Sequence, residues 1–437
     1  MDIASIVPNK VYNDSRVRRS SKALAKKGYN LTVYGFGSEN YIKDFVDGYN
    51  LIIIEKINFT NFVRTRNIVK KINKNLASDN NINSSKFKKI IIKICNWIIS
   101  KSGLIKLFRV IGGYILIYNL VASRICKNID PEKYRIIHAH DFIALICAIR
   151  LKNKNKSLKI IWDAHEAYTE LDYKSLIDKL YISYLIKRFS KRIDFFITIN
   201  NSFKTFYKKN FPNLPNAIVI MNATKYIAEK PNKKKSPLRI STGILDSQKI
   251  LLMQGNLINN RGIEILIELG KKYLPDNWSI IFMGSGSMQK VIQRGMTISN
   301  KKREKGKEAI LLIPKVPYDD LINWSCGADL GALLYQDSSF NQRYCTPNKL
   351  WEYPNANLPV LASNLYEIKK VIKKYKFGII LDENLSAKQL GKLLSDLNDK
   401  EIKEMSNNCN NFMKREGWGK NEKKLFNLYD RLNYLSK

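Results

Sequence analysis

The chain has 437 residues, of which 45% are hydrophobic and 26% are charged, which is the balance of a folded protein. This composition excludes a largely disordered chain, a collagen and a coiled-coil rod. Lys and Arg number 75 and Asp and Glu number 38, so the net charge is +37. Such a charge indicates anionic partners, namely nucleic acid, an acidic membrane surface or phosphorylated substrates.

The charge is unevenly distributed along the chain. Residues 1–250 carry 46 basic and 18 acidic side chains (+28), whereas residues 251–437 carry 29 and 20 (+9). We therefore expect the first part to meet the anionic partner, with a compositional bias toward Lys as the alternative explanation. The six cysteines have no paired spacing, which predicts free thiols in a reducing compartment. The N-terminal residues lack the pattern of a signal peptide. The longest apolar run, 110–123, is shorter than a membrane-spanning helix, which needs about 20 residues.

Apolar runs typical of strands alternate with amphipathic runs typical of helices, in two series. Helical patterns lie between the runs, for example at 15–27, 261–273 and 387–397. Continuous apolar strands joined by helices predict parallel sheets covered on both faces, and hence two doubly wound α/β domains. The first series predicts strands at 2–7, 31–35, 51–57, 134–138, 159–163, 193–199 and 217–221. After a basic linker at 230–239, the second predicts strands at 250–255, 278–283, 309–316, 328–334, 358–363 and 377–381.

An insertion at 85–124 interrupts this alternation. Its first half places lysines on one face of a helical pattern and isoleucines with Trp97 on the other. This pattern is typical of a helix that lies in a membrane interface, and it predicts contact with an anionic membrane surface. An ordinary amphipathic helix that packs on the core of its own domain is the alternative.

The three histidines lie in two clusters, HAHD at 138–141 and DAHE at 163–166, each at the end of a predicted strand. Ligands of doubly wound domains bind at the carboxyl ends of strands, so we interpret the clusters as polar groups that line a cleft between the domains. Helix capping by Asp141 and Asp163 is an alternative. A metal site is a weaker one, because we expect His138 and His140 to point to opposite sides of a strand.

Two segments of the second series suggest an anion site. The segment GNLINNRG at 255–262 resembles a phosphate-binding turn with Arg261 beside a helix N-terminus, although a plain turn is equally compatible. In the second segment, Thr346 is predicted to cap a helix that begins at Pro347. Lys349 would then face an anion and Glu352 would accept hydrogen bonds from ribose hydroxyls, unless both are simply solvated.

Together these segments resemble the retaining glycosyltransferases of family 4, which have the two-domain GT-B fold. The resemblance covers nearly the whole chain, and its motifs occur in the family's order. They are NDSRVRR at 13–19, IIHAHD at 136–141, WDAHE at 162–166, PNKLWEY at 347–353 and LPVLAS at 358–363. The resemblance implies an acceptor domain at 1–230 and a nucleotide-sugar domain at 231–415, facing each other across a cleft, with a C-terminal helix at 416–437 that returns to the first domain.

The resemblance also implies roles for individual residues. Glu352 would bind the donor ribose, Arg261 would hold the donor diphosphate, and His165 would face the transferred sugar; these three are the expected catalytic residues. The remaining expected donor contacts are Asn256, Gly284, Val316, Tyr344, Asn348, Lys349 and Leu350. The remaining expected residues of the acceptor side are Asn13, Asp14, Arg16, His140, Asp141 and Glu166.

Four positions depart from the family's pattern. Tyr344 stands where the family has its first glutamate, which puts contacts to the sugar hydroxyls in doubt, and Asn256 stands where an arginine is common. Asn357 replaces a glycine but tolerates the left-handed conformation after a helix. Pro354 is expected to end its helix, because proline removes a hydrogen bond and clashes with the preceding turn.

The resulting prediction is a metal-independent, retaining hexosyltransferase that needs no cofactor. It would transfer a sugar from a nucleotide diphosphate sugar to a lipid-linked saccharide in bacterial surface polysaccharide or lipopolysaccharide synthesis. We expect the protein in the cytoplasm, peripheral on the inner face of the membrane and bound there through 85–124, with no nucleic acid partner. The alternatives are a nucleotide-sugar epimerase on the same fold, or a non-catalytic protein that binds membrane or nucleic acid.

Overall fold

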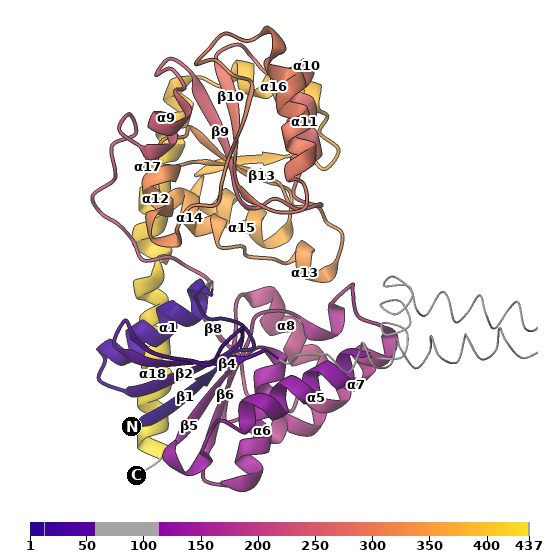
Figure 1. Cartoon of the computed structure of the whole chain (residues 1–437), viewed down its shortest axis with the longest axis vertical. Coiled ribbons are helices and arrows are strands. Elements are labelled where there is room, and N and C mark those ends of the chain that lie inside the picture. Colours follow the sequence, from indigo (N-terminus) through magenta and orange to yellow (C-terminus); the bar gives the residue numbers. More distant parts are fainter. Residues whose placement is uncertain (13, 57–112, 436–437) are drawn as a thin grey trace, which may run out of the picture. The chain divides into compact units, whose positions relative to one another are not determined.

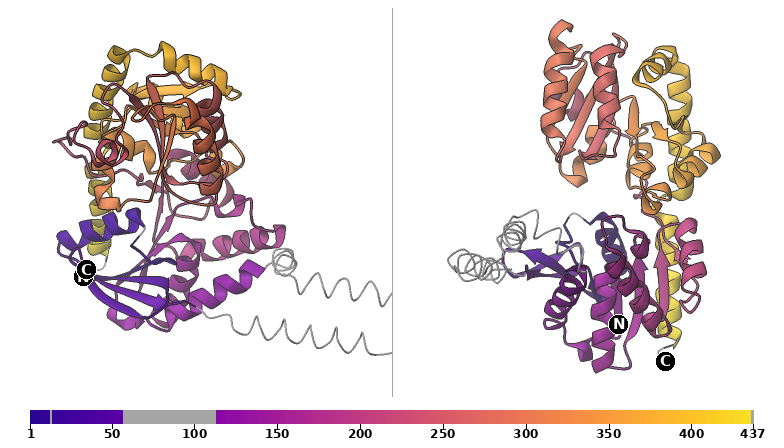
Figure 2. Two further views of the ribbon diagram at one scale, coloured as in Figure 1. Left: turned by 45° about the horizontal axis from the view of Figure 1, so that its top comes forward. Right: turned by 90° about the vertical axis from the view of Figure 1, so that its right-hand side faces the viewer.

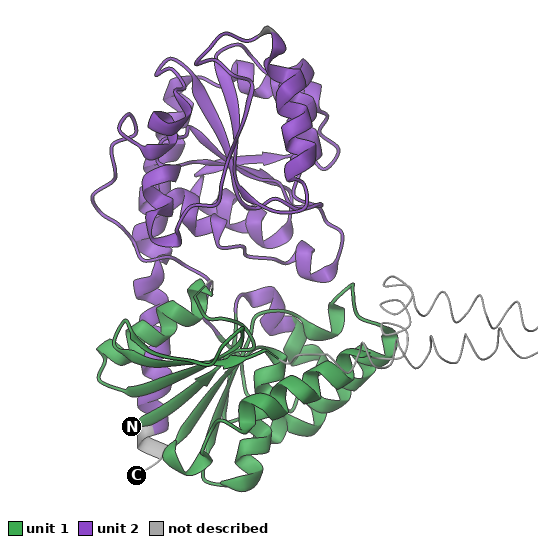
Figure 3. Ribbon diagram, viewed as in Figure 1, with its two compact units in different colours: residues 1–198, 206–218 green, residues 199–205, 219–437 purple. Residues whose placement is uncertain are grey.

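A computed structural model describes residues 1–12, 14–56 and 113–435 of the chain. These residues form two compact units (Figure 3). Unit 1 comprises residues 1–198 and 206–218, and unit 2 comprises residues 199–205 and 219–437. Asn13 and residues 85–112 of the predicted insertion lie outside the described residues.

Unit 1 is built on a sheet of eight strands in the order β3-β4-β2-β1-β5-β6-β7-β8. The central strand β1 pairs in parallel with β2 and with β5, as a doubly wound sheet requires. Every strand predicted in this part of the chain is present. The strands are β1 (Asp2–Ile6), β2 (Asn30–Ser38), β3 (Ile42–Val46), β4 (Tyr49–Glu55), β5 (Ile136–His140), β6 (Lys159–Ala164), β7 (Phe195–Thr198) and β8 (Ile218–Val219).

The edge strand β3 was not predicted. It pairs antiparallel with β4 through a hairpin whose turn residues Asp47 and Gly48 have φ of 54° and 89°. An Asp-Gly pair between two short strands is a known hairpin signal, so the sequence did contain the information. The charged side chains of Lys43 and Asp44 obscured it, because an exposed edge strand lacks the apolar run of a central one.

Helices lie on both sides of each sheet (Figures 1 and 2). In unit 1 strands and helices alternate along the described residues, except that β2, β3 and β4 follow one another directly. They are α1 (Ser15–Lys26), α5 (Gly113–Cys126), α6 (Asp141–Lys154), α7 (Leu176–Phe189) and α8 (Asn201–Asn210), the last of which contains residues of both units. Single 3₁₀ turns lie at Pro131–Lys133, Tyr168–Glu170 and Ser190–Arg192.

Unit 2 is built on a six-stranded sheet in the order β11-β10-β9-β12-β13-β14, in which all neighbours are parallel. This order, with the first strand in the middle, is that of a doubly wound domain. The strands are β9 (Lys249–Asn256), β10 (Trp278–Ser285), β11 (Ile310–Ile313), β12 (Leu330–Leu333), β13 (Val360–Ser363) and β14 (Gly378–Leu381). The helices are α9 (Pro237–Thr242), α10 (Ile263–Lys272), α11 (Gln289–Ser299), α12 (Leu321–Ser325), α13 (Phe340–Arg343), α14 (Lys349–Asn355), α15 (Tyr366–Tyr375), α16 (Ala387–Asp396), α17 (Asp399–Glu416) and α18 (Trp418–Leu435), with 3₁₀ turns at Asn300–Lys302 and Tyr318–Asp320.

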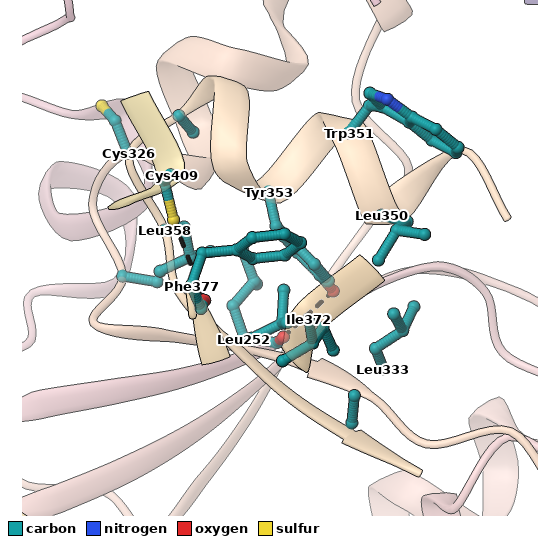
Figure 4. Close-up of a cluster of buried hydrophobic side chains, with 14 of the residues drawn as sticks. Leu252, Cys326, Leu333, Leu350, Trp351, Tyr353, Leu358, Ile372, Phe377 and Cys409 are labelled. Carbon is teal, nitrogen blue, oxygen red and sulfur yellow. Dashed lines mark hydrogen bonds between the residues drawn. The ribbon is translucent and has the colours of Figure 1, made fainter. Parts of the chain in front are cut away.

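Two hydrophobic clusters cover the two faces of this sheet. Successive residues of β9 alternate between them: Leu252 belongs to one cluster, and Leu251 and Met253 belong to the other. Both faces of the strand are therefore buried, which explains why its sequence is continuously apolar. The first cluster contains Trp351 and Tyr353 of α14 (Figure 4), so this short helix is fixed to the centre of the sheet.

None of the helices among the described residues combines the length and the apolar character needed to cross a membrane. The five cysteines among these residues are free thiols, as predicted.

Candidate active site

The predicted residues of unit 1 gather at the carboxyl ends of β5 and β6. Asp163 of β6 lies at their centre, 2% exposed, and Arg16 of α1 binds it through two hydrogen bonds, Nε to Oδ2 at 2.8 Å and Nη2 to Oδ1 at 2.7 Å. Burial alone would raise the pKa of Asp163, but the charges of Arg16 and His165 hold it well below its usual range. Asp163 is therefore a buried carboxylate. We call Arg16, His138, His140, Asp141, Asp163 and His165 the histidine cluster.

His138 and His140 lie on the same side of β5, which corrects the expectation that they point apart. Their rings stack with centroids 4.2 Å apart, and His140 Nδ1 lies 3.3 Å from Asp163 Oδ2. Strand β5 continues to His140 and does not end at His138. The two histidines are two residues apart, and such residues lie on the same face of a strand. Burial and the neighbouring His140 lower the pKa of His138 well below its usual value, so this ring is neutral.

The grouping of His138, His140 and Asp163 brings one ligand atom of each within 4.8 Å of the others, a spacing that a metal ion could use. However, Arg16 already binds both oxygens of Asp163. In this arrangement the charge of Asp163 is already paired with that of Arg16.

His165 lies between two carboxylates. Its Nδ1 is 3.3 Å from Asp141 Oδ1, and its Nε2 is 3.4 Å from Asp163 Oδ2. Burial lowers the pKa of His165, but the charges of Asp141 and Asp163 outweigh this and raise the pKa to about 9. His165 is thus an imidazolium at neutral pH, held in orientation by a carboxylate on each side.

Asp141 is fixed in an unusual backbone conformation. It is the first residue of α6 and has φ of 70°, a region that non-glycine residues rarely adopt. Its Oδ1 accepts a hydrogen bond from the hydroxyl of Tyr168, a residue that sequence reasoning missed. Neither Asp141 nor Asp163 caps a helix, so the capping alternative is wrong: α6 is preceded by His140 without a side-chain cap, and Asp163 lies within β6.

The other predicted residues of unit 1 lie around this cluster. Asp14 caps α1 by accepting a hydrogen bond from Val17 N–H at 3.1 Å, and it also accepts one from Asn9 at 2.8 Å. Burial would raise the pKa of Asp14, but the charge of His165 and these hydrogen bonds lower it overall. Glu166 is exposed, and its backbone carbonyl accepts a hydrogen bond from Tyr207 at 2.6 Å.

In unit 2, the predicted donor contacts surround the carboxyl ends of β9 and β10. Asn256 is the last residue of β9 and pairs with Ser285. Gly284 has φ of 153°, and a Cβ there would lie 1.9 Å from the carbonyl oxygen of Gly255. Only glycine allows this close approach of two backbones. Val316, half-buried, follows β11 at the same edge of the sheet.

Two cations flank the aromatic ring of Tyr335 at this edge. Arg261 Cζ lies 3.8 Å from the ring centroid, and Lys349 Nζ lies 5.9 Å from it. Within the described part of the chain, no carboxylate forms an ion pair with either residue, and Arg261 Nη1 is buried without a hydrogen-bond partner. A Cβ at residue 255 would meet Lys349 Nζ at 2.9 Å, so the lysine reaches the end of β9. This Arg261–Lys349 pair is suited to bind an anion.

Glu352 of α14 lies three residues after Lys349 and is buried, with 8% of its surface exposed. Its Oε2 accepts a hydrogen bond from Gln254 Nε2 at 3.2 Å, and Gln254 Oε1 accepts one from Ser325 Oγ at 2.7 Å. Sequence reasoning missed Gln254 and Ser325. A signal existed for the first, because Gln254 is a polar residue inside an otherwise apolar, buried strand.

Helix α14 differs from its prediction at both ends. It begins at Lys349 with Asn348 at the N-cap, so Thr346 does not cap it and Pro347 is not its first residue. It continues through Pro354 to Asn355, one residue beyond the predicted end, because a proline in the last turn interrupts little of the helix. Asn357 adopts φ of 56°, which confirms the left-handed conformation that was predicted for it.

The side chains of Tyr344 and Leu350 pack against other hydrophobic side chains. The Tyr344 ring packs against Phe340 and Tyr366, with centroids 4.7 and 5.5 Å away, and its backbone carbonyl accepts a hydrogen bond from Asn200 at 2.8 Å. The Tyr344 side chain therefore belongs to an aromatic cluster. Leu350 is fully buried in the core (Figure 4).

Residues 234–416 match the family described as Glycosyl transferases group 1, and this match covers most of unit 2. No curated protein matches the sequence of the chain. Among solved structures, sucrose-phosphate synthase from Thermosynechococcus elongatus is similar over 100% of both chains, with a TM-score of 0.65 and 12% identity.

Two further solved structures are similar over nearly the whole chain. HepE of Anabaena, in complex with UDP and glucose, has a TM-score of 0.67 and 11% identity over 99% of this chain and 100% of that chain. WaaG, a glycosyltransferase involved in lipopolysaccharide biosynthesis, has a TM-score of 0.56 and 13% identity over 97% of this chain and 98% of that chain. These similarities confirm the predicted GT-B fold.

Proposed function

We propose that this chain is a retaining glycosyltransferase of family 4 that uses a nucleotide diphosphate sugar as donor. The observation that carries the proposal is the Arg261–Lys349 pair, two cations without a carboxylate partner among the described residues, at the carboxyl ends of the central strands of unit 2. The match of residues 234–416 to group 1 glycosyl transferases and the UDP bound by HepE support it.

The donor would bind through its nucleotide and its diphosphate. Glu352, a buried carboxylate on the same helix as Lys349, would accept hydrogen bonds from the ribose hydroxyls. Negative charge develops on the leaving diphosphate during transfer, and Arg261 with Lys349 would stabilise it without a metal ion. Asn256 and Gly284 would contribute backbone groups close to the diphosphate.

In the transfer, one bond at the anomeric carbon is replaced by another. The bond to the diphosphate oxygen breaks, and a bond to the acceptor hydroxyl forms on the same face of the sugar, which retains its configuration. The hydroxyl proton passes to the departing diphosphate oxygen. His165, held in orientation by Asp141 and Asp163, would face the transferred hexose.

We propose a lipid-linked saccharide as the acceptor, and surface polysaccharide or lipopolysaccharide synthesis at the inner face of the bacterial cytoplasmic membrane as the setting. The charge of +28 on residues 1–250 supports an anionic membrane as partner. The involvement of WaaG in lipopolysaccharide biosynthesis is consistent with this proposal.

The test is thermal stabilisation by UDP, GDP, ADP, CMP and their sugars, on the wild-type chain and on Glu352→Ala. A ligand at 100 times its dissociation constant stabilises the folded state by about 2.7 kcal/mol, which shifts the melting temperature visibly. We expect a shift with one base, lost in Glu352→Ala and retained in the matched control Glu268→Ala, whose carboxylate is exposed on α10. No shift with any nucleotide would contradict the proposal.

Kinetics then separate the two donor residues. We expect Glu352→Ala mainly to raise the KM for the donor and Arg261→Ala mainly to lower kcat, because ribose contacts act equally in the ground and transition states. Unchanged kinetics in both variants would remove this site assignment. Conversion of the donor into an epimeric sugar without any acceptor would identify the chain as an epimerase instead.

A further inference from the structure

Helices α5 and α7 of unit 1 carry exposed apolar side chains that the proposed chemistry does not use. Nineteen large hydrophobic side chains of the described residues are exposed; six of them lie on these two helices, and a seventh, Tyr173, lies three residues before α7. Singly scattered apolar residues are normal on a surface, whereas such a concentration marks an interaction site. The seven are Leu116, Leu120, Tyr173, Leu176, Ile177, Leu180 and Tyr184.

These side chains form a stripe along each helix. On α7, Leu176, Leu180 and Tyr184 are 72%, 62% and 54% exposed and follow one another at intervals of four residues. On α5, Leu116 and Leu120 have the same spacing, with 54% and 38% exposed. Residues four apart share one face of a helix, so each stripe is continuous.

The two helices are adjacent and run in the same direction. Tyr114 meets Tyr173 near their N-terminal ends, with ring centroids 5.9 Å apart, and Asn119 donates a hydrogen bond to Tyr181 at 2.8 Å further along. At 100° per residue, Asn119 and Tyr181 each lie about a quarter turn from the stripe of their own helix. Both stripes therefore lie on the same outer side of the pair, which we call the α5–α7 face.

The exposed charges on the two helices are basic, whereas the exposed Asp172 lies next to Tyr173, and Glu55 pairs with Arg124 at 3.5 Å. The only acidic residue of the two helices, Asp178, is fully buried, whereas Lys187 and Arg188 are exposed at the end of the α7 stripe. Arg124 and Lys127 hold the corresponding position after the α5 stripe. At the opposite end, Lys174 is buried with its Nζ 3.0 Å from the centroid of the Tyr114 ring, and burial lowers its pKa to about 7, so it adds little charge to the surface.

We infer that the α5–α7 face is a docking surface for an anionic lipid bilayer. Its aliphatic stripes would enter the acyl boundary, and its tyrosines and basic ends would lie among the headgroups. A second copy of the chain fits less well, because it would bring the same basic side chains together.

The position of the face deepens the proposed function, on which this step rests. The segment from His165 to Leu176 links the end of β6 directly to the first exposed residue of the α7 stripe. Docking through α7 would therefore hold the proposed sugar-facing histidine close to the membrane, where a lipid-linked acceptor resides.

The test is co-sedimentation of the full chain with vesicles of phosphatidylglycerol and phosphatidylcholine in equal parts. We expect Leu176→Ser with Leu180→Ser to weaken binding about tenfold or more, because two exposed leucines no longer leave water. The matched control is Ile240→Ser with Ile298→Ser, which alters side chains 70% and 53% exposed on α9 and α11 of unit 2 and should bind like the wild type. Lys187→Gln with Arg188→Gln should weaken binding to these vesicles but not to pure phosphatidylcholine.

Three outcomes would overturn the inference. The first is unchanged vesicle binding by the Leu176/Leu180 variant, and the second is an equal loss in the control. The third is a wild-type dimer that the Leu176/Leu180 variant disperses in sedimentation velocity, which would assign the face to a second copy. Nucleotide stabilisation of the wild type and of these variants keeps the two proposals apart, since a wild type that binds vesicles but no nucleotide refutes only the glycosyltransferase assignment.

Discussion

Asp163 is the residue on which the histidine cluster depends. It is buried, it is bound by two nitrogens of Arg16, Nε and Nη2, and it contacts His140 and His165. A buried carboxylate is costly unless cations and hydrogen-bond donors surround it, so its neighbours are all cationic or able to donate. Asp163 thereby fixes the orientation of His165, the expected sugar-facing residue.

The first prediction concerns the Arg16–Asp163 pair. Arg16→Met should lower the free energy of unfolding by about 3–5 kcal/mol, because it leaves the Asp163 carboxylate buried without its partner. Urea unfolding measures the change. Lys307→Met is the control, because its pair with Glu304 is exposed and should contribute less than about 1 kcal/mol. A loss as small as that of the control would show that the cluster is not held together by this pair.

The second prediction concerns the charge of His165. Its pKa in the folded chain is about 9, above its usual value of 6.5. The stabilisation is therefore fully present below pH 6.5 and is lost as the pH rises toward 9. The stability difference between wild type and His165→Asn should shrink across this range, and nuclear magnetic resonance should resolve the His165 titration from the two other histidines. If His165 titrates near pH 6.5, Asp141 and Asp163 do not stabilise its charged form, and the prediction is wrong.

At the scale of elements, α14 is positioned by its C-terminal turn. Leu358 N–H donates to Tyr353 O at 3.0 Å and Asn357 N–H donates to Pro354 O at 3.0 Å, which is the hydrogen bonding of a Schellman motif. The motif requires a left-handed residue, and Asn357 fulfils this with φ of 56°. It ends the helix that carries Lys349 and Glu352, so the turn contributes to the geometry of the candidate donor site.

The third prediction tests this turn. Asn357→Gly should stabilise the fold by about 0.5–1 kcal/mol, because glycine adopts the left-handed conformation freely. The substitution also removes a buried side-chain oxygen, Oδ1, that has no hydrogen-bond partner. Asn357→Ala should destabilise the fold by about 1–2 kcal/mol. Thermal unfolding measures both, and an Asn357→Gly variant less stable than wild type would indicate that the amide makes a needed contact.

At the scale of the whole molecule, the overall positive charge and the candidate anion site of unit 2 are expected to bind different partners. The net charge of +37 is concentrated in residues 1–250, whereas the Arg261–Lys349 pair belongs to the part of the chain with a charge of only +9. A general attraction to anionic surfaces and a specific anion site are therefore separate properties. They should respond differently to salt, because exposed charges are screened more strongly than partly buried ones.

The fourth prediction follows from this separation. Raising the salt from about 0.1 M to about 1 M shortens the screening length from about 10 Å to about 3 Å. Binding to phosphatidylglycerol vesicles should weaken strongly, while the affinity of the preferred nucleotide should change much less. Parallel titrations of both ligands over this range measure the two slopes. Equal slopes would mean that nucleotide binding is only part of the general attraction between a basic chain and polyanions.

Much of the fold could be predicted because its signals are local. An apolar run such as that of β9 indicates a strand buried on both faces, and the patterns between the runs indicate helices, so the two doubly wound sheets were predictable. The edge strand β3 was not predicted, since it has no apolar run, and the ends of α14 were misplaced, because tertiary packing overrides weak capping preferences.

The candidate site could be predicted in its residue types but not in its pairings. The sequence by itself determined that the histidines lie at strand ends and that Arg261 precedes a helix, because the ends of strands and helices are encoded by neighbouring residues. Only the tertiary structure decided that Arg16 binds Asp163, 147 residues away, and that Gln254 reaches Glu352, 98 residues away. The physical reason is that such contacts depend on which strands become neighbours, a choice made by the burial of the whole sheet rather than by any segment alone.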